Sequence, residues 1–223
     1  MADNSIKNAY KLSRNVYDDV LTQTGFGWKL YNFIFWGGVD DVAISKYILD
    51  KIPKDFSGKI LDVPAGTARF TFEKYAALPL AEIICLDYSE DMLNQARARF
   101  EKHNLTNVQC IQGDVSNLPF EDETFDILVS MNGIHAFPNK KQAFSEIFRV
   151  LKKGGIFSGC FYIKGICRRT DFLVNTVLAP KGWFTPPFQN YGEITEILKE
   201  QYTTVNIFHQ QSIVYFCCEK TDT

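Results

Sequence analysis

Hydrophobic and polar positions follow two different periods along the chain. Up to about residue 55, apolar and aromatic residues recur at helical spacing, and glycines at 25, 27, 37 and 38 break the pattern into short helices. Asp40 is suited to cap a further helix that reaches Lys51. From Lys59 onward, short apolar runs alternate with amphipathic segments, which predicts strands alternating with helices. The expected strands cover residues 59–63, 81–87, 108–113, 125–131 and 155–163.

Two of the amphipathic segments carry helix signals. Ser89 is a suitable N-cap, and the acids Glu90 and Asp91 suit the positive end of the helix dipole. The expected apolar stripe of this helix consists of Met92, Leu93, Ala96 and Phe100. The second stripe consists of Phe144, Ile147, Phe148 and Leu151. The lysines and glycines at 152–155 are expected to end this second helix with cations and a glycine C-cap.

The C-terminal part has a different pattern. Two strand-like runs, 203–208 and 212–219, are separated by three residues, which is enough only for an antiparallel pair. The whole pattern predicts an α/β fold, with a mainly parallel sheet covered by helices on both faces and a terminal antiparallel hairpin. We expect a helical cap or lid at 1–55 and a core at 56–223. Within the core, 164–190 is expected to be a mobile lid insertion before a helix at 191–201.

Composition excludes several classes of protein. The 223 residues include 24 Lys and Arg against 26 Asp and Glu, so no basic excess predicts a nucleic-acid or anionic membrane partner. The longest apolar runs are too short to cross a bilayer, and the N-terminal residues lack the pattern of an export signal, which predicts a cytoplasmic protein. The six cysteines form no C-x-x-C pair, so buried reduced thiols are expected rather than a metal site.

Candidate chemistry lies at the predicted carboxyl ends of the strands. Residues 60–71, ILDVPAGTARFT, predict a strand, a tight turn and a helix start, and Asp87 ends the next strand. Asp62, Asp87 and Asp114 then stand at successive strand ends, where open α/β sheets bind ligands. Asp87 is suited to accept both ribose hydroxyls, and Asp114 to accept from an adenine amine. Each acid alone is better explained as a solvated loop or cap residue, but three in register at successive strand ends favour a site.

These motifs together resemble a known family. ILDVPAGTARFT, LDYSEDML, QGDVSNLPFEDETFDILVS and HAFPNKKQAFSEIFRVLKKGG occur in this order over about 59–157. They resemble the class I S-adenosylmethionine-dependent methyltransferases, in particular the small-molecule branch that includes the quinone-biosynthesis methyltransferases. The resemblance implies a Rossmann-like, seven-stranded sheet. It also implies S-adenosyl-L-methionine as cofactor, S-adenosyl-L-homocysteine as product, and a monomer or homodimer.

The turn departs from the family pattern at two positions. Pro64 and Ala68 stand where the family usually has glycine, and only Gly66 remains. Proline removes an N–H, and alanine adds a Cβ that faces the ligand. A dinucleotide pyrophosphate needs close backbone approach and loses more from these changes than the amino-acid end of S-adenosylmethionine. The turn therefore disfavours a nicotinamide cofactor more than it disfavours methyl transfer.

The resemblance implies roles for individual residues. Asp62 and the backbone of Ala65, Gly66 and Thr67 would hold the methionine moiety. Arg69 would pair with its carboxylate, or is simply a surface arginine. The Met131–Asn132 backbone would receive the ammonium group, and Asp87 would bind the ribose. The residues expected around the adenine are Tyr88, Met92, Asp114 and Val115.

The acceptor side is predicted from aromatic residues and one histidine. His135, just after the fourth strand, is the candidate general base, and a structural histidine packed near Phe137 is an equal alternative. The expected acceptor pocket draws on Tyr10, Tyr17, Trp36, Phe137, Tyr162, Trp183, Phe184 and Phe188. Such a pocket suits a small, partly apolar molecule methylated at oxygen, nitrogen or carbon. Two alternatives stay open, a nicotinamide-dependent oxidoreductase and a non-catalytic cofactor-binding protein on the same fold.

Overall fold

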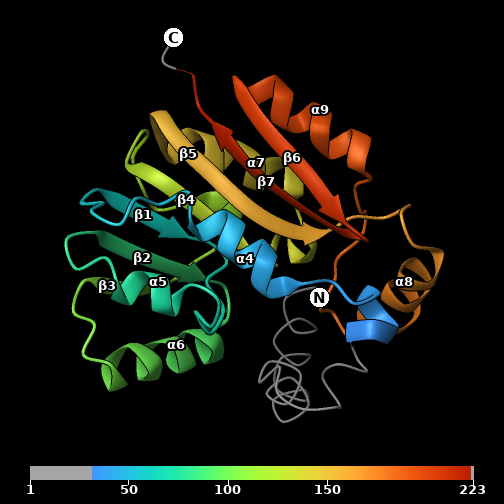
Figure 1. The fold of residues 1–223 in the computed structure, drawn as a ribbon, viewed down its shortest axis with the longest axis horizontal. Helices are drawn as coiled ribbons and strands as arrows, with labels where there is room; N and C mark the ends of the chain where they lie inside the picture. Colours follow the sequence, from blue (N-terminus) through green and yellow to red (C-terminus); the bar gives the residue numbers. More distant parts are fainter. Residues whose placement is uncertain (1–31, 222–223) are drawn as a thin grey trace.

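The computed structural model describes residues 32–221 (Figure 1). Within this range, seven strands form one sheet in the order β3-β2-β1-β4-β5-β7-β6. Neighbours from β3 to β5 are parallel, whereas β7 is antiparallel to both β5 and β6. The predicted sheet is therefore confirmed. The strands are β1 (Lys59–Asp62), β2 (Glu82–Asp87), β3 (Val108–Gln112), β4 (Phe125–Met131), β5 (Leu151–Tyr162), β6 (Thr204–Gln210) and β7 (Ile213–Glu219).

Helices cover both faces of the sheet, as expected. α4, α5 and α6 pack on one face, and α7 and α9 pack on the other. Successive strand residues alternate between the faces, so Cys85 of β2 belongs to the same buried cluster as Tyr75 of α5, while Leu86 belongs to the same cluster as Ile147 of α7. The helical segments are η1 (Asn32–Trp36), α4 (Asp41–Leu49), α5 (Phe72–Ala76), α6 (Glu90–Lys102), η2 (Val115–Asn117), η3 (Ile134–Ala136), α7 (Lys140–Val150), α8 (Arg168–Leu173), η4 (Val174–Leu178) and α9 (Tyr191–Gln201).

Two predicted N-caps are confirmed. The Ser89 side chain accepts a hydrogen bond from the Met92 amide at the start of α6, and Asp40 does the same for Ala43 at the start of α4. The predicted apolar stripe of α6 is buried. The predicted bounds of α9 are confirmed, whereas α4 ends at Leu49, two residues before the expected end. Short-range capping chemistry therefore predicted the helix starts better than their ends.

The expected glycine C-cap at 152–155 is wrong. α7 ends at Val150, and the lysines and glycines belong to β5. The Gly154 amide donates to the Lys220 carbonyl, so this stretch is part of the sheet. A Cβ at Gly155 would lie 2.8 Å from the Lys152 carbonyl oxygen. The glycines therefore accommodate an irregular start of a strand rather than the end of a helix.

The 164–190 segment contains helices that were not expected. α8 and η4 follow one another, and Val174 and Leu178 are buried against the sheet face that α4 also covers. Two contacts join this segment to η1. The Thr170 hydroxyl donates to the Phe35 carbonyl at 2.7 Å, and Arg169 donates to the Phe33 carbonyl at 2.8 Å. The N-terminal part and the insertion thus meet in space. Whether the insertion moves as a lid stays a prediction.

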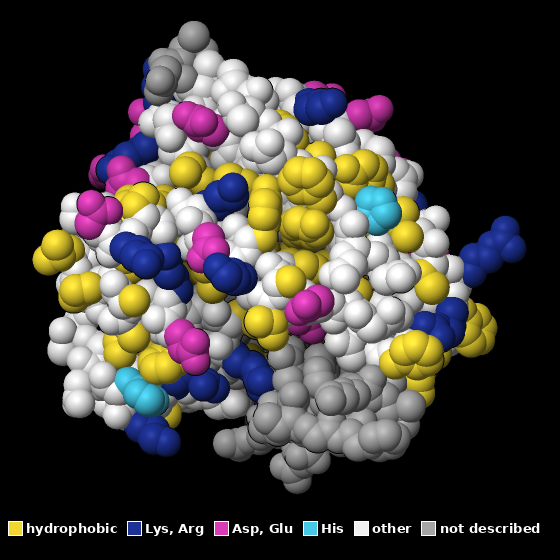
Figure 2. Space-filling model, in the orientation of Figure 1, with side chains coloured by type: hydrophobic (Ala, Val, Ile, Leu, Met, Phe, Trp, Pro, Cys, Tyr) yellow, Lys and Arg dark blue, Asp and Glu magenta, His cyan; other side chains and the backbone are white. Residues whose placement is uncertain are grey.

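The surface carries charges of both signs (Figure 2), as the nearly balanced numbers of acidic and basic residues predict. Figure 2 shows acidic and basic side chains interspersed on the face in view, with hydrophobic side chains gathered over β6 and β7. No helix among residues 32–221 is long and apolar enough to cross a membrane. The six cysteines are free thiols, and Cys85, Cys160 and Cys218 are buried. In the same residue range, no group of His, Cys, Asp and Glu is arranged to hold a metal ion.

Candidate functional site

The carboxyl ends of the parallel strands meet at one edge of the sheet. Asp62 ends β1 and Asp87 ends β2, and the parallel register brings both ends to the same side. Met131 ends β4, the neighbour of β1 on the other side, so the chain changes direction across the sheet between β1 and β4. Ligands in open α/β sheets bind outside such a switch point. The structure therefore brings three predicted site residues to one edge.

The turn after β1, residues 63–68, is held by backbone hydrogen bonds to both neighbouring strands. The Val63 amide donates to Val129 of β4 and the Ala65 amide donates to Leu86 of β2, each at 2.9 Å. Gly66 has φ +54°, and a Cβ built there would meet nothing within 4 Å. Open space on this side of the backbone leaves room for a ligand to approach the turn.

The two departures from the family pattern have visible structural effects. Ala68 adopts φ +53°, a left-handed conformation that glycine takes more easily. Pro64 packs against Gly133, where a Cβ would lie 2.0 Å from the proline Cγ. Gly133 directly precedes η3, so the turn after β1 and the turn after β4 are in close contact. Glycine at 133 provides the space that the ring at 64 occupies.

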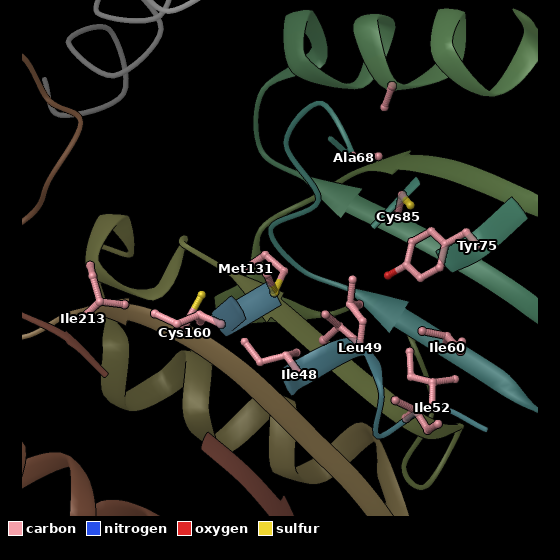
Figure 3. Close-up of a cluster of buried hydrophobic side chains, with 14 of the residues drawn as sticks. Ile48, Leu49, Ile52, Ile60, Ala68, Tyr75, Cys85, Met131, Cys160 and Ile213 are labelled. Carbon is pink, nitrogen blue, oxygen red and sulfur yellow. The ribbon is translucent and has the colours of Figure 1, made fainter. Parts of the chain in front are cut away.

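Asp62 is a buried carboxylate with one satisfied and one unsatisfied oxygen. It is 1% exposed, and its Oδ2 accepts from the Thr71 and Tyr75 hydroxyls at 2.9 Å each. Figure 3 shows Tyr75 in the buried cluster beneath this edge, together with Ala68. Oδ1 is buried and has no hydrogen-bond partner within the part of the chain that the structure describes. Burial raises the pKa of Asp62 to about 7.

Sequence analysis missed Thr71 and Tyr75, which orient this carboxylate. Thr71 is the N-cap of α5 and Tyr75 lies within this helix, and neither position differs in sequence from an ordinary helix residue. The sequence did contain a signal for this contact. Tyr75 is a tyrosine on the apolar face of a short helix, and that helix follows an acid at a strand end. A buried Tyr hydroxyl needs a polar partner, and the acid of the preceding strand is the nearest one in the chain.

Asp87 connects the ends of β1 and β2. It is 8% exposed, and its two oxygens accept from the amides of Gly66 and Ser89, each at 2.8 Å. Burial raises the pKa of this carboxyl despite these hydrogen bonds, which act in the opposite direction. Each carboxylate oxygen can accept a second hydrogen bond. Asp87 thus fixes the turn and still has acceptor capacity for hydroxyl groups.

The expected adenine-side residues lie next to the end of β2. The Gly113 amide donates to the Asp87 carbonyl at 3.0 Å, which places Asp114 beside this strand end. Asp114 is exposed, and its Oδ1 accepts from the Ser116 amide at 2.8 Å as the N-cap of η2. Val115 is buried, Met92 is 9% exposed and Tyr88 is 40% exposed. Asp114 therefore has a capping role in addition to the predicted ligand role.

Arg69 lies near a second arginine. Burial lowers the pKa of Arg69, and the charge of Arg99 lowers it further. Arg99 donates to the carbonyl of Thr67, which is buried, at 3.2 Å. Two cations that repel one another beside the turn favour a bound anion, as the sequence predicts for the methionine carboxylate.

The end of β4 is fixed to β5. Asn132 adopts φ +55°, and its amide donates to the Cys160 carbonyl at 2.9 Å. The Cys160 thiol in turn contacts the Asn132 side-chain oxygen at 3.5 Å. Figure 3 shows Met131 and Cys160 beside Ile48 and Leu49 of α4. These contacts fix the backbone that was predicted to receive the ammonium group.

Four aromatic residues that were predicted for the acceptor pocket form a cluster, which we call the aromatic cluster. Its members are Trp36, Tyr162, Phe184 and Phe188. The Trp36 ring stacks on Phe184 at 5.9 Å, and Tyr162 contacts Trp36 edge-on at 6.2 Å. The Tyr162 hydroxyl donates to Asp171 at 2.7 Å, so its polar end is satisfied from α8. Segments far apart in the sequence thus meet here.

The other expected pocket residues are distributed differently. Phe137 is buried in the opposite face of the sheet, among the residues that α7 and α9 cover. Trp183 is half-buried next to the aromatic cluster, with the Lys181 ammonium 5.0 Å from its ring. Tyr10 and Tyr17 lie outside the described residues. The structure therefore brings Trp36 and Tyr162 together and separates Phe137 from them.

His135 is buried, and its Nδ1 and its ring face have partners. It is 8% exposed, its Nδ1 accepts from the Tyr162 amide at 3.3 Å, and its ring stacks on Phe184 at 3.9 Å and 11°. Burial, followed by the charge of Lys140, lowers the pKa of His135 to about 3. The imidazole is therefore neutral at physiological pH and a weak base. Its stacking partner is Phe184, not the expected Phe137.

Comparison with known proteins identifies related sequences. A family model described as "Methyltransferase domain" matches residues 54–178. The demethylmenaquinone methyltransferase of Lactococcus lactis is 38% identical over 103 residues, which cover 45% of this chain and 41% of that protein. An uncharacterized chloroplastic methyltransferase of Arabidopsis thaliana is 32% identical over 137 residues, covering 60% of this chain and 36% of the other. The match thus spans less than half the length of either relative.

Solved structures share the fold. A Thermotoga maritima protein, described as a SAM-dependent methyltransferase and possible histamine N-methyltransferase, superposes with a TM-score of 0.68. The two chains are 16% identical over 97% of this chain and 100% of the other. This level of identity shows a common fold and nothing about the acceptor.

Proposed function

The chain belongs to the family of class I S-adenosylmethionine-dependent methyltransferases, and on this premise we propose that it methylates a small, partly apolar molecule. The match of the family model to residues 54–178 supports methyl transfer. The aromatic cluster supports an acceptor with an apolar ring or chain. The cytoplasmic location and the monomeric or homodimeric state stay predictions.

One observation carries the proposal, the unsatisfied Oδ1 of Asp62. A buried carboxylate oxygen without a partner is costly, and a ligand cation at this edge would satisfy it. The ammonium of the methionine moiety has the charge and the hydrogen-bond donors that this oxygen lacks. Gly66, with open space beside its backbone, lies in the same turn. The residues present therefore fit S-adenosylmethionine.

With the methionine ammonium at Asp62, the other parts of the cofactor are assigned to the remaining predicted residues. We assign the methionine carboxylate to Arg69 and the ribose hydroxyls to Asp87. We assign the adenine to the residues that adjoin the end of β2. These are Tyr88, Met92, Asp114 and Val115. The backbone of Ala65 and Thr67, together with that of Met131 and Asn132, would complete the methionine site.

Bound S-adenosylmethionine supplies an electrophilic methyl group, so the protein's task is to align an acceptor and exclude water. The aromatic cluster forms an apolar wall from which water is excluded, and its rings can stabilise a nearby sulfonium. His135 is held by Tyr162 and Phe184, and its low pKa makes it a poor proton acceptor. We therefore favour transfer by alignment, while the base role of His135 stays a prediction.

Calorimetric titration tests the proposal and separates it from the alternatives. The purified protein should bind S-adenosylmethionine and S-adenosylhomocysteine, and NAD should produce no comparable heat. Binding of NAD alone would contradict the cofactor assignment. A panel of phenols, quinols and amines with radiolabelled methyl donor then tests turnover. Tight cofactor binding with no transfer to any acceptor would favour the non-catalytic alternative.

A further inference from the structure

Lys140, the first residue of α7, is a buried cation that the proposed function does not use. It is 6% exposed, although lysine is almost never buried without a pairing group. Its Nζ donates to two backbone carbonyl oxygens, Phe137 at 3.0 Å and Thr185 at 2.5 Å. Burial lowers its pKa to about 8. A lysine kept here at such a cost suggests that these two carbonyls must be held together.

Both backbone groups of Thr185 are bound to the same region. Its amide donates to the His135 carbonyl at 3.0 Å, and its carbonyl accepts from Lys140. The preceding residue, Phe184, stacks on the His135 ring at 3.9 Å. The Phe188 ring lies 5.8 Å from the Lys140 ammonium. Residues 183–188 are therefore attached to η3 and to the start of α7 through one ammonium, one amide and one ring stack.

We propose that Lys140 is a positioning residue that holds residues 183–188 against the turn after β4 and so fixes the aromatic wall of the acceptor pocket. The ammonium bridges the carbonyl that follows η3 and the carbonyl of Thr185. Charge-assisted hydrogen bonds are about twice as strong as neutral ones, so the two hydrogen bonds of this ammonium hold the segment more firmly than neutral ones would. Phe184 then lies against His135 and Trp36, where the acceptor is expected to bind.

The consequence for catalysis rests on the proposed function. Lys140 contacts the Phe137 carbonyl after η3, and the Thr185 carbonyl and Phe188 ring of the 183–188 segment, none of which is assigned to the cofactor. Its loss should therefore weaken acceptor binding and leave S-adenosylhomocysteine binding unchanged. His135 in this arrangement supplies a backbone carbonyl and a stacking surface. Its side chain stacks on the Phe184 ring and so positions it.

Hydrogen exchange at the Thr185 amide tests the proposal without any assumption about activity. The first two residues of a proteolytic peptide retain no deuterium, and Pro186 and Pro187 have no amide hydrogen, so a peptide over 183–188 reports mainly on Thr185 and Phe188. Lys140→Met keeps the length of the side chain and removes its donors. We expect exchange in this peptide to become at least about tenfold faster, because the segment opens more often. Lys141→Met, at the exposed next position, is the matched control and should exchange like the wild type.

The wild-type protein supplies a second test if Lys140→Met fails to fold. After correction for intrinsic exchange chemistry, protection of this peptide should fall several-fold from pH 7 to pH 9, because the ammonium loses its proton near pH 8. The other charged or titratable side chains that face this segment are His135, Lys181 and Asp171. His135 is already neutral, and Lys181 is exposed over the Trp183 ring. Asp171, the acid facing the same cluster, is bound by Tyr162.

The outcomes separate this proposal from the proposed function. Unchanged exchange in Lys140→Met, or equal protection at pH 7 and pH 9, would overturn the positioning role even if turnover fell. Faster exchange with a raised acceptor KM and unchanged S-adenosylhomocysteine affinity would support both proposals. Faster exchange in a protein that methylates nothing would support the positioning role and contradict the proposed function.

Discussion

The turn after β1 and the aromatic cluster are built in opposite ways. The turn is one contiguous stretch, residues 63–68, and backbone hydrogen bonds to β2 and β4 determine its shape. The aromatic cluster takes its residues from η1, the end of β5 and the 183–188 segment, and ring contacts hold it together. A contiguous backbone element constrains which ligand it accepts, whereas dispersed side chains can change one at a time. The turn, which we propose as the cofactor side, is therefore the more constrained of the two regions.

A buried titratable group in each region shows the same contrast. Asp62 keeps one oxygen unsatisfied, and burial raises its pKa to about 7. His135 has a hydrogen-bond donor and a stacked ring, and burial lowers its pKa to about 3. Both groups favour the neutral state in the free protein. Asp62 Oδ1 lacks a partner that a ligand can provide, while Nδ1 and the ring face of His135 already have partners in the chain.

The largest expected effect comes from Asp87→Ala. This change removes the ribose acceptor and releases the Gly66 amide from its partner. We expect S-adenosylmethionine affinity to fall about hundredfold or more, because a hydrogen bond to a charged group and the shape of the turn are lost together. Titration calorimetry measures the S-adenosylmethionine affinity of the variant and of the wild type. Asp114→Ala is the comparison variant and should lose less, and an unchanged affinity in Asp87→Ala would contradict the assignment.

Gly133→Ala should strain the contact between the turn after β1 and the turn after β4. The added Cβ would lie 2.0 Å from the Pro64 Cγ, and one of the two turns must shift. We expect a loss of about 1–3 kcal/mol in the free energy of unfolding, measured by urea titration. Pro64→Ala in the same chain should recover much of this loss, since the nearest remaining atom, the Cβ at 64, lies at 3.5 Å. Simple additivity of the two changes would argue against the contact.

Asp62→Asn should separate stability from binding. The folded protein keeps a proton on Asp62 up to about pH 7, whereas the unfolded chain releases it near pH 3.8. Wild-type stability therefore falls as pH rises from about 4 to about 7, and Asn does not show this loss. At pH 8 we expect the variant to be more stable by roughly 1–3 kcal/mol, and to bind S-adenosylmethionine about tenfold more weakly.

Thermal unfolding at pH 4 and pH 8 measures this difference. Near pH 4 the two proteins should be similar, because the wild-type carboxyl is then protonated in the folded state. A variant that is less stable than the wild type at pH 8 would show that the carboxylate has a partner that compensates its burial. In that case the argument that Asp62 awaits a ligand cation would fail.

Ala68→Gly should produce the smallest effect. Gly relieves the left-handed φ of +53° but loses a buried methyl group and adds chain entropy in the unfolded state. We expect a net gain of less than about 1 kcal/mol in unfolding free energy. Ala65→Gly, without a positive φ, should instead lose about 0.5–1 kcal/mol. The same sign for both changes would mean that the conformation at 68 is not strained.

The contrast also explains what could be predicted from the sequence. The strand ends at Asp62 and Asp87 follow from short apolar runs, and the α6 start follows from the Ser89 cap. Each of these signals is local. The stretch at 152–155 was assigned to a helix end because lysines and glycines fit a C-cap, and only pairing with the distant Lys220 shows that it belongs to β5.

The aromatic residues show where prediction from sequence stops. Phe137 follows η3 and Phe184 belongs to the 183–188 segment. The two side chains are equally apolar, yet they pack on opposite faces of the sheet. No local pattern distinguishes them, because the face is set by the path of the chain after β4 and β5. Lys140 also looks like a surface residue at a helix start. Its burial depends on Thr185, a residue 45 positions away.

The position of β7 has a consequence for how the protein is made. This strand is later in the chain than β6 but lies between β5 and β6 in the sheet. Until residues 213–219 have left the ribosome, the backbone edge of β5 at residues 156–162 has no neighbouring strand, and β6 has no strand to join. A nascent chain that pauses here is therefore open to intermolecular strand pairing, and insertion of one strand completes both edges at once.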